Sequence, residues 1–133
     1  MPCPAPPRLN DHEALRLALL EAGLLLRSAH DDLERFDAAR ARLLAFCWER
    51  LVPHLEHDEA WLLAADTCPT GRLLADAMRT EARAMTAAVL ELEGATDPCE
   101  AIGAVRALHA LLAAHAHHED LLATAGLTPG RST

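Results

Sequence analysis

The chain has 133 residues, which is below the size at which a second hydrophobic core is expected, so a single domain is predicted. Hydrophobic residues make up 51% of it, and they are mostly Ala and Leu rather than the β-branched and aromatic residues that strands favour. This composition predicts an all-α fold. The net charge of −8 and the absence of a basic stripe exclude a surface suited to the phosphate backbone of nucleic acid.

The sequence contains no recognisable export or membrane signal. Its proline-rich start lacks the apolar region of a secretory leader, and the four cysteines form no C-x-x-C pair. The longest apolar run, residues 17–26, contains Glu21 and is flanked by Arg16 and Arg27, so it is too short and too charged to span a bilayer. We therefore expect a cytoplasmic protein with free thiols and no membrane partner.

In chain order, four segments carry apolar residues at the three- and four-residue spacing of helices. They cover residues 11–28, 31–66, 71–93 and 97–126, and turn signals at 28–32, 67–71 and 94–98 separate them. Short connections make neighbouring helices antiparallel, so we predict an up-down-up-down antiparallel four-helix bundle over residues 10–126. A proline-rich disordered tail at 1–9 and a frayed tail at 127–133 are expected to flank it.

Local signals refine the helix boundaries. Asp31, with Glu34 three residues on, can form a capping box at the start of the second helix. Gly94 is a typical helix stop, and Asp97 followed by Pro98 is a typical helix start. Pro53 lies inside the second expected helix, where it removes a backbone hydrogen bond and is expected to kink the helix.

A motif of the form H-x-x-H-acid-acid occurs twice, at residues 54–59 and 115–120. In each copy a histidine shares one helical face with a carboxylate four residues on: His54 with Asp58, and His115 with Glu119. These faces are also the leucine-rich ones, where a polar pair is costly to bury unless something satisfies it. A hydrogen-bonded core pair is one reading of each copy. The repetition favours the other reading, a metal site, because imidazole and carboxylate suit iron, manganese or zinc.

The positions of these residues relative to the turns predict further ligands. In antiparallel helices, residues equidistant from a turn lie side by side. This places His12 beside His54, and Glu81 at the level of both Asp58 and His115. One cross-section of the bundle is therefore predicted to hold a metal site made of six residues: His12, His54, Asp58, Glu81, His115 and Glu119. A position on the helix surface is the alternative for Glu81.

The remaining histidines are expected to lie outside the site. We interpret His57, His117 and His118 as surface groups or as groups behind the ligands, and His30 and His109 as structural or solvated. Spacing excludes several other metal sites, since the chain has no H-E-x-x-H for a zincin and no E-x-x-H for a ferritin-like di-iron bundle. It also has no C-x-x-C-H for haem attachment.

These residues resemble the haemerythrin-like (HHE cation-binding) family over about residues 10–126. The most specific parts are W-E-R-L-V-P-H at 48–54 with D-E at 58–59, L-L-A-A-H at 111–115 with E-D at 119–120, and N-D-H at 10–12. The resemblance implies a four-helix bundle with two non-haem irons, bridged by Asp58 and Glu119. It implies His12, His54 and His115 as terminal ligands and an open position that binds dioxygen or a related small oxidant.

The chain departs from that family at two positions. The family's third helix usually supplies a histidine directly after a Glu, whereas here Glu81 is followed by Ala82, and Asp58 replaces the usual Glu. Non-catalytic binding or sensing of dioxygen is the leading expectation, although manganese or zinc also suits the ligands. A di-iron oxidoreductase that reduces peroxide or nitric oxide, or a protein that handles iron, is the second. A metal-free helical interaction module is the third.

Overall fold

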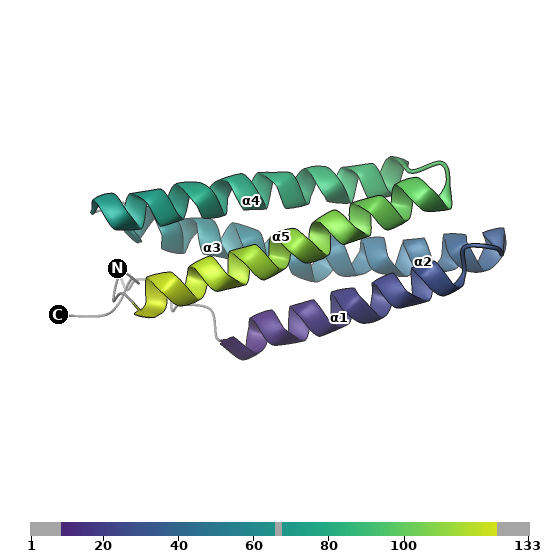
Figure 1. Ribbon diagram of the computed structural model, residues 1–133, viewed down its shortest axis with the longest axis horizontal. Coiled ribbons are helices and arrows are strands. Elements are labelled where there is room, and N and C mark those ends of the chain that lie inside the picture. Colours follow the sequence, from purple (N-terminus) through teal and green to yellow (C-terminus); the bar gives the residue numbers. More distant parts are fainter. Residues whose placement is uncertain (1–8, 66–67, 125–133) are drawn as a thin grey trace.

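The computed structural model describes residues 9–65 and 68–124, and every regular element within these ranges is helical. The elements are α1 (Leu9–Ser28), α2 (Leu33–Phe46), the π-helical turn η1 (Cys47–Leu51), α3 (Val52–Ala65), α4 (Pro69–Gly94) and α5 (Pro98–Thr124). Since α2, η1 and α3 follow one another without a break, the described residues form four long helical rods (Figure 1). The all-α class is confirmed. The predicted tails lie outside the described residues, apart from Leu9, which begins α1.

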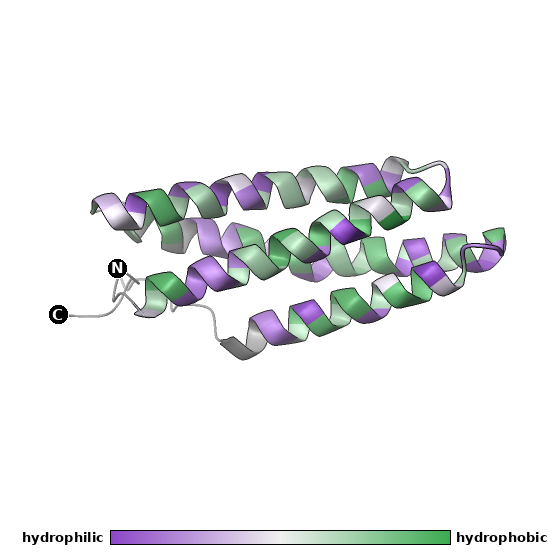
Figure 2. Ribbon diagram, in the orientation of Figure 1, coloured by the Kyte–Doolittle hydropathy of each residue, from purple (hydrophilic) through white to green (hydrophobic). Residues whose placement is uncertain are grey.

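The rods lie side by side along the long axis of the molecule. In Figure 1, the α1–α2 and α4–α5 connections lie at one end, while the end of α3 and the start of α4 lie at the other. α5 packs against both α4 and α1, and α4 also packs against α2 and α3. Figure 2 shows that hydrophobic and hydrophilic residues alternate along each rod, as they do when one face of a helix is buried. No helix in the described ranges has the length and apolarity needed to cross a membrane.

The ends of the helices agree with the turn signals except at the starts of α2 and α4, and α4 begins at Pro69, inside the turn predicted at 67–71. The backbone of Asp32 is extended, with φ of −129°, and its carboxylate accepts a hydrogen bond from the Arg35 amide at 3.2 Å. The predicted capping by Asp31 is therefore wrong by one residue, because the helical backbone begins at Leu33. The start of α5 is as predicted, since Asp97 accepts a hydrogen bond from the Glu100 amide at 2.9 Å.

The irregularity expected at Pro53 lies just before it, in η1. There the amide of Val52 donates to the carbonyl of Cys47, five residues back, which is a π-helical rather than an α-helical step. In an α-helix, side chains four residues apart rotate gradually away from the core, because one turn takes only about 3.6 residues. The wider π-helical turn compensates for this rotation. Cys47, Leu51 and Leu55 consequently all remain buried, and Asp58 follows on the same side.

A polar layer divides the hydrophobic core into two clusters. Helices α3, α4 and α5 each contribute to both clusters. Leu55, Met85 and Leu112 belong to the larger cluster, and Leu62, Met78 and Leu122 belong to the smaller one. Between the two cluster residues of each helix lie Asp58 on α3, Glu81 on α4, and His115 and Glu119 on α5. The faces that build the core therefore also bring titratable side chains together inside it.

Candidate metal centre

Five titratable side chains from three rods meet in the polar layer. His12 comes from α1, His54 and Asp58 from α3, and His115 and Glu119 from α5. His12, Asp58, His115 and Glu119 are 4% exposed or less, and the side chain of His54 is 12% exposed. Groups of this kind are rarely buried so deeply without a strong partner, so the layer must satisfy them internally or through a bound ion.

The Nε2 atoms of all three histidines face the two carboxylates. The Nε2 of His115 lies 2.9 Å from Asp58 Oδ2 and 3.3 Å from Glu119 Oε1. The Nε2 of His54 lies 3.2 Å from the same Asp58 oxygen and 3.9 Å from Glu119 Oε1. The Nε2 of His12 contacts Glu119 Oε2 and lies 3.1 Å from the Nε2 of His54.

These atoms are spaced closely enough for a shared cation. One ligand atom from each of His12, His54, Asp58 and Glu119 lies within 4.8 Å of all the others. This span is close to the diameter of a coordination sphere with bonds of about 2.1 Å. The structure thus brings four of the six predicted residues within reach of one cation, and the Nε2 of His115 lies against the two carboxylates of this group.

Unsatisfied atoms in the layer provide a test of whether a metal fits. Asp58 Oδ1 and the Nδ1 atoms of His12 and His115 are buried without a hydrogen bond among the described residues. The facing Nε2 atoms of His12 and His54 can share only one proton between them, whereas a cation accepts a lone pair from each. Since imidazole nitrogen and carboxylate oxygen are donors that iron, manganese and zinc accept, the residues present fit a divalent transition metal.

Burial shifts the proton affinities of four of these groups. Burial raises the pKa of Glu119 to about 9. Burial alone would lower the pKa of His115, but hydrogen bonds with Asp58 and Glu119 raise it to about 9. Burial alone would raise the pKa of Asp58, but hydrogen bonds with His115 and His54 hold it well below its usual value. Burial and the neighbouring His54 lower the pKa of His12 to about 4.

These pKa values imply how the layer would be charged at pH 7 in the absence of a cation. The imidazolium of His115 would balance the carboxylate of Asp58, while His12 and Glu119 would be uncharged. Two protons, one on His115 and one on Glu119, therefore supply the two positive charges that a divalent ion would otherwise bring. A metal that displaced both would leave the layer neutral as before.

Glu81 lies behind His115 rather than among the converging atoms. Its carboxylate pairs with His118 Nδ1 at 2.8 Å and lies 3.6 Å from the Nδ1 of His115. A carboxylate on the far side of an imidazole orients the ring and supports its other nitrogen as a metal ligand. The positions along the rods predicted the level of Glu81 correctly, but they contain no information on how α4 is rotated about its axis.

The other histidines lie outside the converging group. His118 is half-buried and contacts Glu81. Its position three residues after His115, on the same helix face, was the signal in the sequence that could have indicated this contact behind the ligands. His57 and His117 are exposed, and His109 is half-buried beside α1. His30 is exposed in the α1–α2 turn, with its Nδ1 2.9 Å from the carbonyl of Arg27.

Helix α4 contributes no imidazole, because it contains no histidine. Ala82, at the position where the resembled family has one, is half-buried and packs against the larger core cluster. It also lines an open groove between α3 and α4, together with Leu55 and Thr86. The chain therefore offers three imidazoles to the layer, fewer than the resemblance would lead one to expect.

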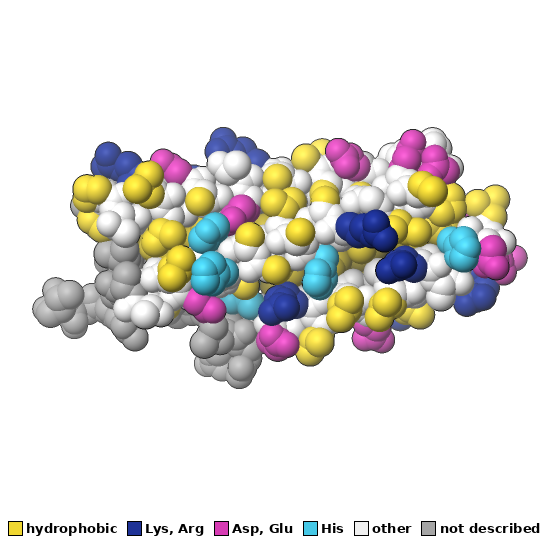
Figure 3. All heavy atoms as spheres, viewed as in Figure 1, with side chains coloured by type: hydrophobic (Ala, Val, Ile, Leu, Met, Phe, Trp, Pro, Cys, Tyr) yellow, Lys and Arg dark blue, Asp and Glu magenta, His cyan; other side chains and the backbone are white. Residues whose placement is uncertain are grey.

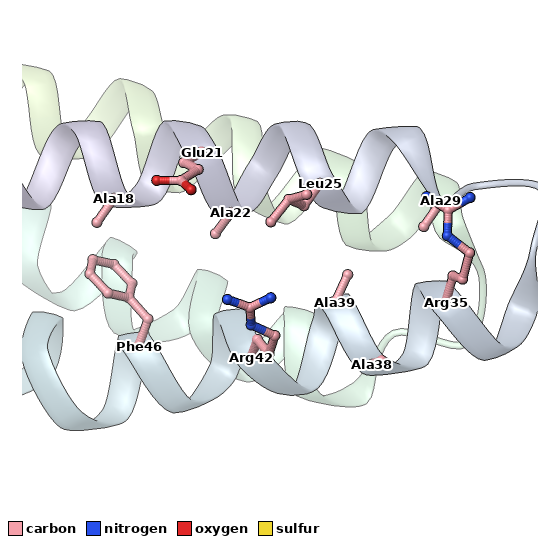
Figure 4. A pocket seen from close by; sticks show the side chains of 10 residues that line it. All are labelled: Ala18, Glu21, Ala22, Leu25, Ala29, Arg35, Ala38, Ala39, Arg42 and Phe46. Carbon is pink, nitrogen blue, oxygen red and sulfur yellow. The ribbon is translucent and has the colours of Figure 1, made fainter.

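A separate groove of about 370 Å³ runs between α1 and α2 (Figure 4). Small side chains such as Ala18 and Ala22 line it, Glu21 and Arg42 point into it from opposite helices, and Phe46 lies at one end. None of its lining residues belongs to the polar layer. The His–carboxylate layer is therefore the better candidate for metal chemistry.

Comparison of the chain with known protein families, with curated proteins and with solved structures gives no match. The interpretation of the site consequently depends on the distances, the burial and the charges of the layer. The group formed by His12, His54, Asp58 and Glu119 could hold a metal ion.

Proposed function

We propose that this protein is a haemerythrin-like, non-haem iron protein, built as an up-down-up-down antiparallel bundle, that binds or senses dioxygen or a related small oxidant. The observation that carries the proposal is the convergence of three imidazole Nε2 atoms and two carboxylates in a buried layer. The order of the connections at the two ends of the molecule in Figure 1 supports the antiparallel arrangement. Imidazole and carboxylate ligands around a site with open positions are typical of non-haem iron that reacts with oxygen.

Two iron ions are favoured over one by the directions of the carboxylate oxygens. Glu119 turns Oε2 towards His12 and Oε1 towards His115, so its two oxygens reach histidines of different helices. Asp58 Oδ2 lies between His54 and His115, and its Oδ1 is buried without a hydrogen bond among the described residues. Each carboxylate could therefore bridge two ions, with His12, His54 and His115 as the terminal ligands.

The surroundings of the layer favour a small neutral ligand. Leucines one turn away along α3 and α5 enclose it on both sides, namely Leu55, Leu62, Leu112 and Leu122. An apolar shell limits the access of water and of charged molecules, and it tunes the chemistry of a metal inside it. When bound, iron would supply reversible coordination of the oxidant. The chain's own contribution would be to hold the ligands, to exclude water and to keep protons on His115 and Glu119 until metal replaces them.

The proposal can be tested by adding ferrous iron to the metal-free full chain without oxygen and then admitting air. We expect about two irons per chain, and an absorption spectrum that changes with dioxygen. His115→Ala should lose both properties, whereas His30→Ala, which alters an exposed histidine of a turn, should keep them. A chain that remains iron-free, and whose thermal stability iron does not change, would instead be a metal-free helical module.

A second candidate, an oxidoreductase that consumes peroxide or nitric oxide, is favoured by one observation. Since α4 contains no histidine and Glu81 lies behind His115, the chain leaves more coordination positions open than it would with a histidine ligand from α4. Iron-dependent consumption of peroxide over many turnovers, lost in His115→Ala, would identify the enzyme. A single stoichiometric reaction would support the binding or sensing role.

A further inference from the structure

Helix α1 carries a row of exposed leucines on the side away from the polar layer. Leu17, Leu20 and Leu24 are 56%, 44% and 56% exposed. Other large hydrophobic side chains are exposed on other helices, but among the described residues this row is unusual because its members follow one another along one helix. A continuous exposed apolar surface is typical of a site where another molecule packs.

The row continues into oppositely charged residues at its two ends. Glu13 stands four residues before Leu17, Arg27 stands three residues after Leu24, and both are exposed. We call the five positions Glu13, Leu17, Leu20, Leu24 and Arg27 the α1 seam. Their alternating steps of four and three residues are the spacing at which one helix packs its side chains against another. The guanidinium of Arg27 has no ion pair within the described ranges, while Glu13 has only a long one, 3.7 Å, with Arg16.

We propose that two copies of this chain associate through the α1 seam, with their α1 helices antiparallel about a two-fold axis beside Leu20. Glu13 and Arg27 are equidistant from Leu20 along the helix. In this pairing Glu13 of one copy therefore approaches Arg27 of the other, at both ends of the interface. A parallel pairing would bring Glu13 against Glu13 and Arg27 against Arg27, so the charges select the antiparallel one.

The surface beside the seam suits such packing. A groove of about 220 Å³ between α1 and α5 is lined by Leu20, Leu24 and Ile102, among others, and offers space for leucines of a second copy. Figure 3 shows hydrophobic side chains and arginines together over α1 and α5. A methyl group added at Gly23 would lie 2.9 Å from Val105 Cγ1, so α1 lies very close to α5 at this point. That close packing holds the seam in a fixed position.

Sedimentation equilibrium of the full chain tests the proposal. The wild type should be a dimer at micromolar concentration. Leu20→Glu should give a monomer with an unchanged helical circular dichroism spectrum, because Leu20 is exposed. The matched control is Leu73→Glu on α4, which replaces a 73% exposed leucine far from the seam in sequence and should leave the dimer intact.

A charge exchange tests the orientation of the two helices. Glu13→Arg alone and Arg27→Glu alone should each raise the dissociation constant of the dimer about tenfold or more, because each places like charges together. The double variant should restore the wild-type value. A monomeric wild type, a dimer that Leu20→Glu leaves intact, or a double variant as weak as the single ones would overturn the proposal. So would a monomer that binds phosphatidylcholine vesicles through Leu20, since a lipid surface would then be the occupant.

Discussion

His115 is the most enclosed residue of the candidate centre. Its side chain is fully buried, its Nε2 faces the carboxylates of Asp58 and Glu119, and Glu81 lies behind its Nδ1. His54 faces the same carboxylates from α3 and is slightly exposed. Both imidazoles are therefore directed at the two carboxylates, and the affinity of a metal bound here should depend on both histidines.

We predict that His115→Ala and His54→Ala each reduce the iron content per chain by half or more. Each change removes a neutral ligand, and the loss of a ligand lowers metal affinity strongly. His30→Ala should leave the content unchanged. Mass spectrometric metal analysis of the three purified variants makes the comparison. Equal losses in all three would mean that metal binds to histidines at the surface.

Metal affinity should rise with pH between 6.5 and 8.5. The pKa values of His115 and Glu119 both lie at about 9, above their ordinary values of 6.5 and 4.5, so both groups hold protons in this range. Metal must displace these protons, and the displacement becomes easier as the pH rises. Titration calorimetry in buffers of different ionisation enthalpy should show the release of about two protons per chain at pH 7, one from His115 and one from Glu119. Binding without proton release would contradict the assigned proton positions.

At the scale of single elements, the beginning of α4 depends on a residue without a side chain. Gly71 is buried, and a Cβ added there would meet the carbonyl oxygen of Ala65 and lie 3.1 Å from Cys68 Sγ. Backbone cannot yield as a flexible side chain can. Gly103 is exposed in the second turn of α5, and a Cβ added there would have nothing within 4 Å.

The two glycines should therefore respond to alanine in opposite directions. Gly71→Ala should lower the free energy of unfolding by about 1–3 kcal/mol, because the overlap forces a backbone shift. Gly103→Ala should raise it by about 0.5–1 kcal/mol, because alanine restricts the unfolded chain and favours the helix. Denaturant unfolding followed by circular dichroism measures both. Equal shifts of the two variants would show that the close contact at Gly71 is absent in solution.

The helices could be predicted from the sequence because their periodic leucines and alanines lie on the faces that are buried. The finer backbone could not. The π turn at η1 depends on how residues 47–58 pack against the other rods, and only its neighbour Pro53 indicated an irregularity there. The cap at Asp32 rather than Asp31 depends on where the turn leaves the backbone extended, which two adjacent acids do not reveal.

The converging site residues were predictable for a similar reason. A four-residue step puts a histidine and a carboxylate on the same face, and equal distances from a turn give the same level, so His54, Asp58, His115 and Glu119 meet. Glu81 also lies at the level of Asp58 and His115 and on the apolar face of its helix. Its contacts with His115 and His118 instead of the centre depend on the rotation of α4, which only the assembled bundle fixes.

At the scale of the whole molecule, the polar layer separates two apolar clusters, so the charge state of the layer should affect global stability. We predict that iron raises the melting temperature of the wild type and that a chelator reverses the increase, because a ligand bound only to the native state stabilises it. The effect should vanish in His115→Ala. A thermal scan with and without iron checks this, and an equal rise in both proteins would indicate unspecific binding.

The metal-free protein should lose stability as the pH rises from 6.5 to 9. The folded pKa values of His115 and Glu119 are raised, so their proton-bound forms stabilise the native state at low pH and this contribution disappears as the pH approaches 9. With iron bound, the ligands carry no such protons and the loss should be smaller. Urea unfolding at pH 6.5 and pH 9, with and without iron, gives the comparison. A metal-free protein equally stable at both pH values would contradict the proton assignment.

The central claim is that one buried layer, made by α1, α3 and α5, is a metal centre. Anomalous X-ray diffraction at the iron edge, on crystals of the iron-loaded full chain, tests it most directly. We predict one or two anomalous peaks inside the bundle, about 2.0–2.2 Å from the Nε2 atoms of His12, His54 and His115 and from oxygens of Asp58 and Glu119. Iron-loaded crystals whose anomalous peaks lie only at surface residues such as His57 or His117 would contradict the claim.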